Sequence, residues 1–135
     1  MAKTLKVGVQ VGGGPGTGFL WHVNYLTVAR KEAMAFLSEE QYQHVVDQFC
    51  GLASESDPTR PVTVEVQAIE SFYEMKDKGG ILGQINLRVF FVVDKATRTI
   101  LVLGSINKSA EGQTPSWIKR RIQLRIRRLS LAQKS

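Results

Sequence analysis

The chain has 135 residues, of which 43% are hydrophobic and 22% are charged. This length suits a single domain whose core is stable without disulfides or metals. The sequence holds no run of about 18 apolar residues and no long apolar leader, so we expect no membrane span and a cytoplasmic location. The single cysteine, Cys50, excludes an intramolecular disulfide and a cysteine-built zinc site, and with two histidines we expect no metal and no cofactor.

The net charge of +6 is unevenly distributed along the chain. Residues 1–107 hold ten basic and eleven acidic residues, whereas residues 108–135 hold eight basic residues and one acidic residue, Glu111. A basic segment on a nearly neutral body favours an anionic partner. The candidates are nucleic acid and an acidic protein, and a membrane surface ranks after these two. The alternative is a solvated helix face that binds nothing.

Residues 1–18 differ in composition from the rest of the chain. The alternating valines of residues 7–11 are typical of a short strand. Residues 12–18 then contain five glycines, but the Gly-Lys-Ser/Thr ending of a phosphate-binding P-loop is missing because Phe19 follows. We therefore predict a glycine-rich N-terminal arm or wide hairpin over residues 1–18 and the main domain over residues 19–135.

The first part of the main domain reads as a strand followed by helices. Apolar and polar residues alternate over residues 19–28, which predicts a strand with one buried face. Residues 29–53 have helical spacing, and a break is expected at Ser38. Ser38 and Gln41 have the spacing of a capping box, so a new helix is predicted to begin there.

Three further strands are predicted at residues 64–76, 85–94 and 98–107. In the second of them the large apolar residues occupy one face, and Arg88 points to the other. An arginine in the middle of a partly apolar strand is costly unless it meets an anion or solvent. Arg88 is therefore a candidate functional residue.

A basic helix is predicted to begin at Thr114–Ser116, where Pro115 suits the first turn. Ile118, Ile122 and either Ile126 or Arg125 form an apolar stripe that covers the sheet. Because the stripe is used in this way, we rank RNA or DNA contact above membrane contact. The basic residues predicted to bind RNA are Lys119, Arg120, Arg121, Arg125, Arg127 and Arg128.

Five segments in their order along the chain resemble those of a known family. Phe72–Lys76 resembles a Leu-Tyr-Glu-Leu-Arg segment, and Leu87–Asp94 resembles a Tyr-Arg-Val-Phe-Phe strand. Ile100–Leu103, Asn107–Ser109 and Thr114-Pro115 resemble an apolar strand, a Lys-Lys-Thr segment and a Thr-Pro helix start. The family with these segments is the RelE/ParE toxin superfamily, in its HigB-like branch.

The resemblance covers residues 19–131 and implies an α+β fold, with a small antiparallel sheet, two N-terminal helices and a basic C-terminal helix. Members are toxins of type II toxin–antitoxin systems, and each is neutralised by an antitoxin encoded beside it. RelE-like and HigB-like members cut mRNA, usually on the ribosome. The partners implied are a cognate antitoxin, mRNA and the ribosome, without a small-molecule cofactor.

The resemblance also implies a mechanism, in which the RNA 2′-hydroxyl attacks the adjacent phosphate without a metal. Arg and Lys side chains stabilise the negative charge that develops, and a lysine or another group with a lowered pKa acts as base. Arg88 matches the strand arginine that would clamp the phosphate, and Lys108 matches a lysine that would bind phosphate or act as base. Lys76 stands in place of an arginine and keeps its charge without the bidentate fork.

Arg125, Arg127 and Arg128 are further candidates for contacts with ribosomal RNA or with the transition state. The chain departs from the family at Asn107, which replaces a lysine, and at Gly104, where relatives often have histidine. Two alternatives stay open. In the first alternative, the chain is a ParE-like gyrase inhibitor that cuts nothing. In the second, it is a non-catalytic module that binds nucleic acid or protein.

Overall fold

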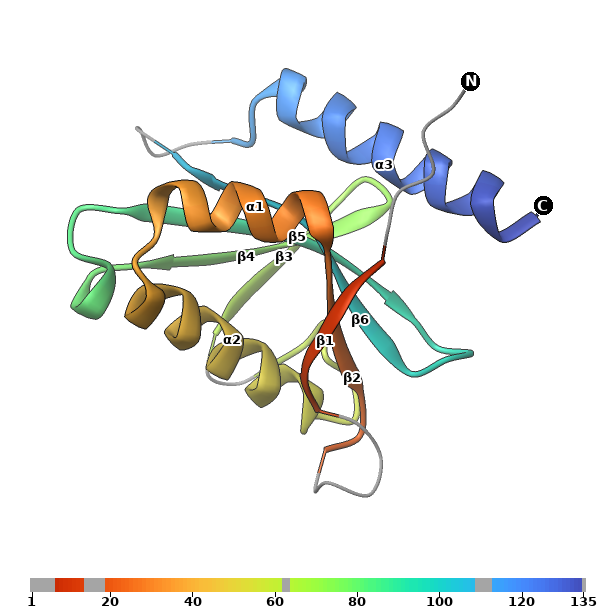
Figure 1. Ribbon diagram of the computed structural model, residues 1–135, viewed down its shortest axis with the longest axis horizontal. Coiled ribbons are helices and arrows are strands. Elements are labelled where there is room, and N and C mark those ends of the chain that lie inside the picture. Colours follow the sequence, from red (N-terminus) through yellow and green to blue (C-terminus); the bar gives the residue numbers. More distant parts are fainter. Residues whose placement is uncertain (1–6, 14–18, 62–63, 109–112, 135) are drawn as a thin grey trace.

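The structure is a computed structural model that describes residues 7–13, 19–61, 64–108 and 113–134 (Figure 1). These residues form an α+β fold, so the predicted class is confirmed. Outside the described residues lie 1–6 and 14–18 of the predicted N-terminal arm and 109–112 between the last strand and the last helix. The expectations for these residues therefore stay predictions.

The described strands form one sheet in the spatial order β1-β2-β6-β5-β4-β3. Their bounds are β1 Val7–Gly13, β2 His22–Leu26, β3 Glu65–Ile69, β4 Phe72–Lys78, β5 Asn86–Asp94 and β6 Thr99–Asn107. All neighbours are antiparallel except β2 and β6, which run parallel. The prediction of a purely antiparallel sheet is therefore wrong. After β2 the chain crosses to the far edge at β3 and returns strand by strand, so β6 arrives beside β2 in the same direction.

The strand predicted over residues 64–76 is a β-hairpin. Glu70 and Ser71 connect β3 to β4, and Glu70 has a positive φ of 45°. This turn holds no glycine, proline or asparagine, so Ser71 is its one turn-favouring residue and the turn signal in its sequence is weak. The predicted meander of three strands consequently has four, and the hairpin adds the edge strand β3.

The helices are α1 Thr27–Phe36, α2 Glu39–Ala53 and α3 Ser116–Lys134. The capping box predicted at Ser38 is present at the start of α2. The Gln41 backbone N–H donates to Ser38 Oγ at 3.2 Å, and the Ser38 backbone N–H donates to Gln41 Oε1 at 2.9 Å. Two N–H groups that helix geometry leaves without a partner are satisfied in this way.

Replacing Ser38 by alanine is expected to lower the free energy of unfolding by about 1 kcal/mol, because the Gln41 N–H loses its acceptor. Urea denaturation followed by circular dichroism measures this change. Ser56→Ala, in the exposed loop after α2, is the matched control. Equal stability of the two variants would contradict the capping role.

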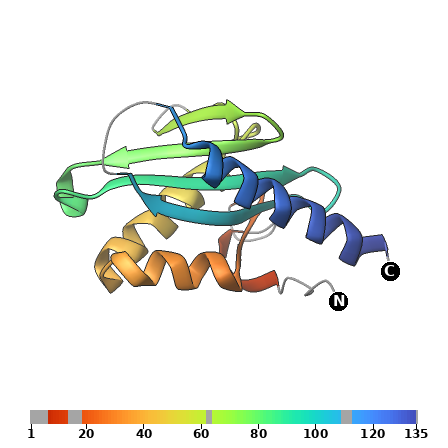
Figure 2. The same cartoon turned by 90° about the horizontal axis from the view of Figure 1, so that it is seen from above.

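Helices α2 and α3 lie on opposite faces of the sheet, with α3 in front and α2 behind in Figure 2. On the α2 face, Phe49 meets Phe91 edge to face with ring centroids 5.4 Å apart. On the α3 face, Ile122 lies directly over Gly104 of β6. Arg88 pairs with Ile106, two residues beyond Gly104, so its side chain projects to the same face as α3.

Candidate functional site

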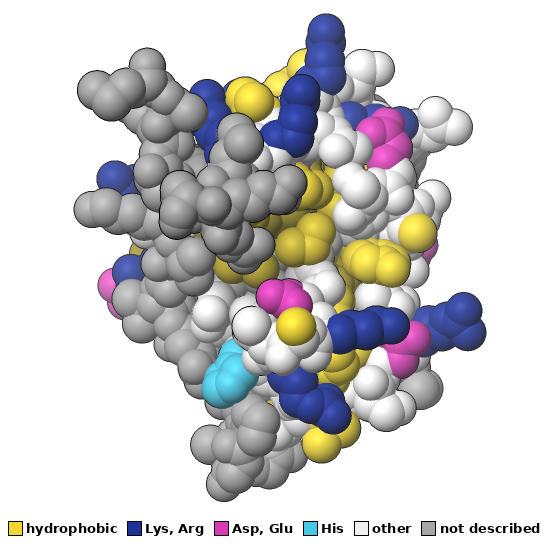
Figure 3. Space-filling view, turned by 90° about the vertical axis from the view of Figure 1, so that its right-hand side faces the viewer, with side chains coloured by type: hydrophobic (Ala, Val, Ile, Leu, Met, Phe, Trp, Pro, Cys, Tyr) yellow, Lys and Arg dark blue, Asp and Glu magenta, His cyan; other side chains and the backbone are white. Residues whose placement is uncertain are grey.

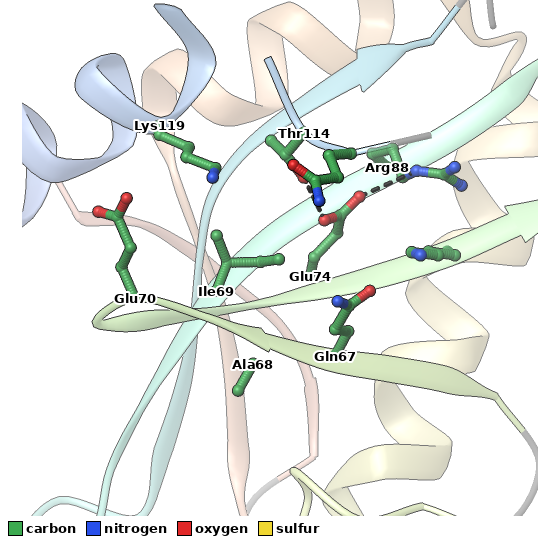
Figure 4. Close-up of a pocket in the computed structure, with 10 residues that line it drawn as sticks. Gln67, Ala68, Ile69, Glu70, Glu74, Arg88, Thr114 and Lys119 are labelled. Atoms are coloured by element: carbon green, nitrogen blue, oxygen red, sulfur yellow. Dashed lines mark hydrogen bonds and ion pairs between the residues drawn. The ribbon is translucent and has the colours of Figure 1, made fainter. Parts of the chain in front are cut away.

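A cavity of about 490 Å³ lies on the α3 face of the sheet, between β3, β4, β5 and the start of α3. Figure 4 shows its lining side chains, which come from the sheet and from the helix. We call it the phosphate cavity, because three of the residues that line it, Lys76, Arg88 and Lys119, are cationic. The residues of its lining that carry charge or a hydroxyl are Glu70, Glu74, Lys76, Arg88, Thr114 and Lys119.

The pairing of β4 with β5 brings Lys76 and Arg88 together. The two residues are directly opposite each other in the antiparallel register, so their side chains share the α3 face. Like charges at opposed strand positions repel, which makes an anion beside them favourable. Glu65 on β3 supplies one carboxylate, with Oε1 3.9 Å from Lys76 Nζ.

Glu74 supplies the second carboxylate, and it is buried. Its Oε1 lies 2.9 Å from Arg88 Nε, while its Oε2 accepts a hydrogen bond from Thr114 Oγ1. Arg88 Nη1 also donates to Asn86 Oδ1 at 3.1 Å. The side chains of Arg88 and Glu74 are 4% and 2% exposed, so the guanidinium is held in one position at the wall of the cavity and is nearly shielded from solvent.

Glu74 is a buried residue of this site that was not identified as functional from the sequence. It lies two positions before Lys76, and alternation along a strand places residues 74 and 76 on one face. This spacing is the feature of the sequence that could have placed Glu74 beside Lys76. The carboxylate positions Arg88 and offsets part of its charge.

Lys119 closes the cavity from the other side. It belongs to the first turns of α3 and is half-buried. In Figure 4 its ammonium group reaches toward the sheet, and Glu74 lies between it and Arg88. The cavity therefore collects three cations, Lys76, Arg88 and Lys119, from two strands and one helix.

Lys108 lies apart from the phosphate cavity. Its backbone N–H donates to Asn86 O at 2.7 Å, and its largely buried side chain lines a second cavity of about 470 Å³ on the far side of the α3 start. The predicted catalytic residues are thus divided between two places. Arg88 and Lys76 share one cavity, and Lys108 borders the other.

Arg125 is buried against α1. Its Nη1 and Nη2 lie 2.8 and 2.7 Å from the two carboxylate oxygens of Glu32, and Nη1 also donates to Leu103 O at 2.6 Å. The guanidinium occupies the space beside Gly104, where an added Cβ would come within 2.9 Å of Arg125 Nη1. These contacts connect α3 to α1 and β6. Arg125, which was predicted to bind RNA, therefore has a structural role.

The other basic residues of α3 point in different directions. Arg120 is exposed beside Lys119, whereas Arg121 turns toward α1 and contacts Glu32 at 3.3 Å. Arg127 is exposed and Arg128 is half-buried. On the face shown in Figure 3, Lys and Arg side chains are interspersed with acidic, neutral and hydrophobic ones. The charge excess of the C-terminal segment is therefore not gathered on one side of the helix.

Within the described part of the chain, no three His, Cys, Asp or Glu side chains are grouped as metal ligands would be. No helix among the same residues has the length and apolar character needed to cross a bilayer. Comparison with known proteins found no matching family model, no matching curated protein and no matching solved structure.

Proposed function

We propose that the chain is a type II toxin of the RelE/ParE superfamily, HigB-like branch, which cuts mRNA on the ribosome in the cytoplasm. The observation that carries the proposal is the phosphate cavity, which Lys76, Arg88 and Lys119 line together. Arg88 and Lys76 come from two of the segments that resemble the family. The order of strand, two helices, returning strands and final helix is also the order that the resemblance implies.

The electrostatics of the cavity suit a phosphate whose charge increases during reaction. Three cations and two carboxylates, Glu70 and Glu74, line the cavity, and the largely exposed Glu65 carboxylate lies 3.9 Å from Lys76 Nζ. Glu74 and Thr114 hold the site in place before substrate arrives. Charged groups that need no rearrangement are the ones that stabilise a transition state best.

The proposed step is attack of the RNA 2′-oxygen on the adjacent phosphorus. The bond from phosphorus to the 5′-oxygen breaks, which leaves a 2′,3′-cyclic phosphate and a 5′-hydroxyl. A base takes the 2′ proton, and the leaving 5′-oxygen gains one. Arg88 and Lys76 stabilise the extra charge on the phosphoryl oxygens, Lys119 neutralises the same group from the helix side, and Glu74 positions Arg88.

An antitoxin would neutralise this activity by covering the cavity. Strand β3 forms one wall of the cavity and is also an edge of the sheet, because it pairs with β4 alone among the described strands. An extended segment added to β3 would lie beside the cavity, and acidic side chains on it would meet Lys76 and Lys119. We propose this edge as the docking place of the cognate antitoxin.

One observation favours a second candidate function, which is phosphate binding without cleavage. Arg88 is already paired with Glu74, so part of its charge is offset before a ligand arrives. A module that binds RNA through Lys76 and Lys119 would tolerate this pairing. Such a module would bind RNA with a steep salt dependence and would leave the RNA intact.

Incubation of the purified protein with mRNA and ribosomes, beside a gyrase supercoiling assay, separates these functions. We expect cuts in the mRNA when ribosomes are present and no effect on supercoiling. Inhibited supercoiling without RNA cleavage would instead identify a gyrase inhibitor. If neither reaction changes and RNA is retained in a salt-dependent manner, the binding module is the better description.

A further inference from the structure

A second depression lies on the other side of the α3 start. It is the cavity of about 470 Å³ that Lys108 borders, and we call it the α1–α3 groove. Its wall on the α1 side includes Phe36, its floor is Ile106 at the end of β6, and Trp117 of α3 forms the opposite wall. The proposed function so far makes no use of this groove.

Trp117 is unusually exposed for a tryptophan, with 52% of its surface accessible. The guanidinium of Arg121 lies over the indole at 5.1 Å from the ring centroid. A large aromatic surface that stays in water is costly and is typical of binding sites. The guanidinium therefore lies against one face of the indole and places a positive charge beside the aromatic surface.

The polar side chains of the groove favour an anionic ligand. Glu32 is its one described carboxylate, and both oxygens of Glu32 contact the buried Arg125. The Arg121–Glu32 contact is longer, at 3.3 Å, and Arg121 is about half exposed. Among the described residues that line the groove, two are cationic, Lys108 and Arg121, and they stand beside its apolar lining.

The groove and the phosphate cavity adjoin each other. Ile106 of the groove pairs with Arg88 of the cavity on the neighbouring strand, about 4.8 Å away across the sheet. On α3, Lys119 lines the cavity, whereas Trp117, two positions earlier, lines the groove. The two depressions therefore flank the start of α3, so one RNA strand that crosses the start of α3 would contact both of them.

We propose that the α1–α3 groove binds one unpaired base of a single-stranded RNA, stacked on Trp117, with Lys108 and Arg121 beside the flanking phosphates. The inference rests on the proposed function, since it assigns a further contact to the same RNA substrate. An aromatic face next to cations is the arrangement by which proteins hold unpaired bases without reading their sequence. A peptide would gain little from the two cations unless it were acidic.

Fluorescence tests this inference directly, because the chain has two tryptophans and only one is exposed. Trp21 is buried, and its Nε1 donates to Glu55 O at 3.0 Å. The probe is a short single-stranded 2′-O-methyl RNA, which cannot undergo attack by a 2′-hydroxyl. We expect this RNA to quench Trp117, and an abasic strand of equal length and charge to leave its fluorescence unchanged.

Binding of the same probe to variants provides the second measurement. Trp117→Ala is expected to weaken binding about tenfold, which is the usual effect of one lost stacking contact. Trp117→Phe should retain most of the affinity, because a phenyl ring still stacks. The matched control is Leu124→Ala, which removes another exposed apolar side chain of α3 outside the groove.

Three results would overturn the inference. They are equal quenching by the abasic strand, equal affinity of Trp117→Ala and Leu124→Ala, and stronger quenching by an acidic peptide than by RNA. Failure of the proposed function looks different. In that case the protein cuts no mRNA, yet the base-dependent quenching of Trp117 persists.

Discussion

Replacing Arg88 by methionine is expected to lower the free energy of unfolding by about 3–5 kcal/mol. The variant leaves the Glu74 carboxylate buried without its ion-pair partner, and an uncompensated buried charge is the costly outcome of breaking such a pair. Glu74→Gln alone should destabilise the protein for the converse reason. Urea denaturation of the purified variants measures both changes.

The double variant Glu74→Gln/Arg88→Met is the informative control. Because it removes both charges together, we expect it to recover most of the stability that Arg88→Met loses. It should nevertheless remain inactive, since the cavity has lost its central cation. Additive destabilisation by the two substitutions would show that Glu74 does not hold Arg88, contrary to the 2.9 Å contact between them.

Replacing Lys76 by alanine is expected to reduce RNA cleavage about 100-fold, the usual order of magnitude when one group that stabilises transition-state charge is removed. The fold should be little affected. The contact of Lys76 with Glu65 spans 3.9 Å, and the Glu65 side chain is largely exposed, so the pair contributes about 1 kcal/mol or less. The measurement is kcat/KM for ribosome-dependent cleavage of a defined mRNA.

Lys95→Ala is the matched control for Lys76. Lys95 lies in the exposed turn between β5 and β6, so its removal changes the net charge equally but leaves the cavity intact. Cleavage by Lys95→Ala should equal that of the wild type. If the two lysine variants cleave at the same rate, the phosphate cavity is not the reaction centre.

The sequence allowed most of the local structure to be predicted. Alternation located β5 and a continuous apolar run located β6, each to within one residue at each end, and the Ser38 capping box located the start of α2. These signals are local, because they depend on residues within one strand or one helical turn. The turn at Glu70 has only the weak signal of Ser71, so β3 and β4 were predicted as one strand.

Long-range pairing could not be read in the same way. The parallel pairing of β2 with β6 depends on which edge of the sheet the chain reaches after α2, and no residue pattern encodes that choice. Buried ion pairs are likewise not encoded by a local residue pattern. Glu74 with Arg88 and Glu32 with Arg125 join residues that are 14 and 93 positions apart, so the partner of each arginine emerges only from the fold.

The candidate site was predicted in part. Arg88 was conspicuous as a charge in an apolar strand, and the register explains why Lys76 lies beside it. Lys108 was assigned to the same site by its position in the resemblance, whereas the chain turns away after β6 and places it in the α1–α3 groove. The helical spacing left Ile126 and Arg125 as alternatives for the buried position, and Arg125 is the more deeply buried of the two.

The central claim is that the cavity around Arg88 and Lys76 promotes attack by a 2′-hydroxyl on a neighbouring phosphate. End-group analysis of mRNA treated with the wild-type protein and ribosomes tests this claim most directly. We predict fragments that end in a 2′,3′-cyclic phosphate and begin with a 5′-hydroxyl. Intact mRNA, or fragments with 3′-hydroxyl and 5′-phosphate ends, would contradict the claim.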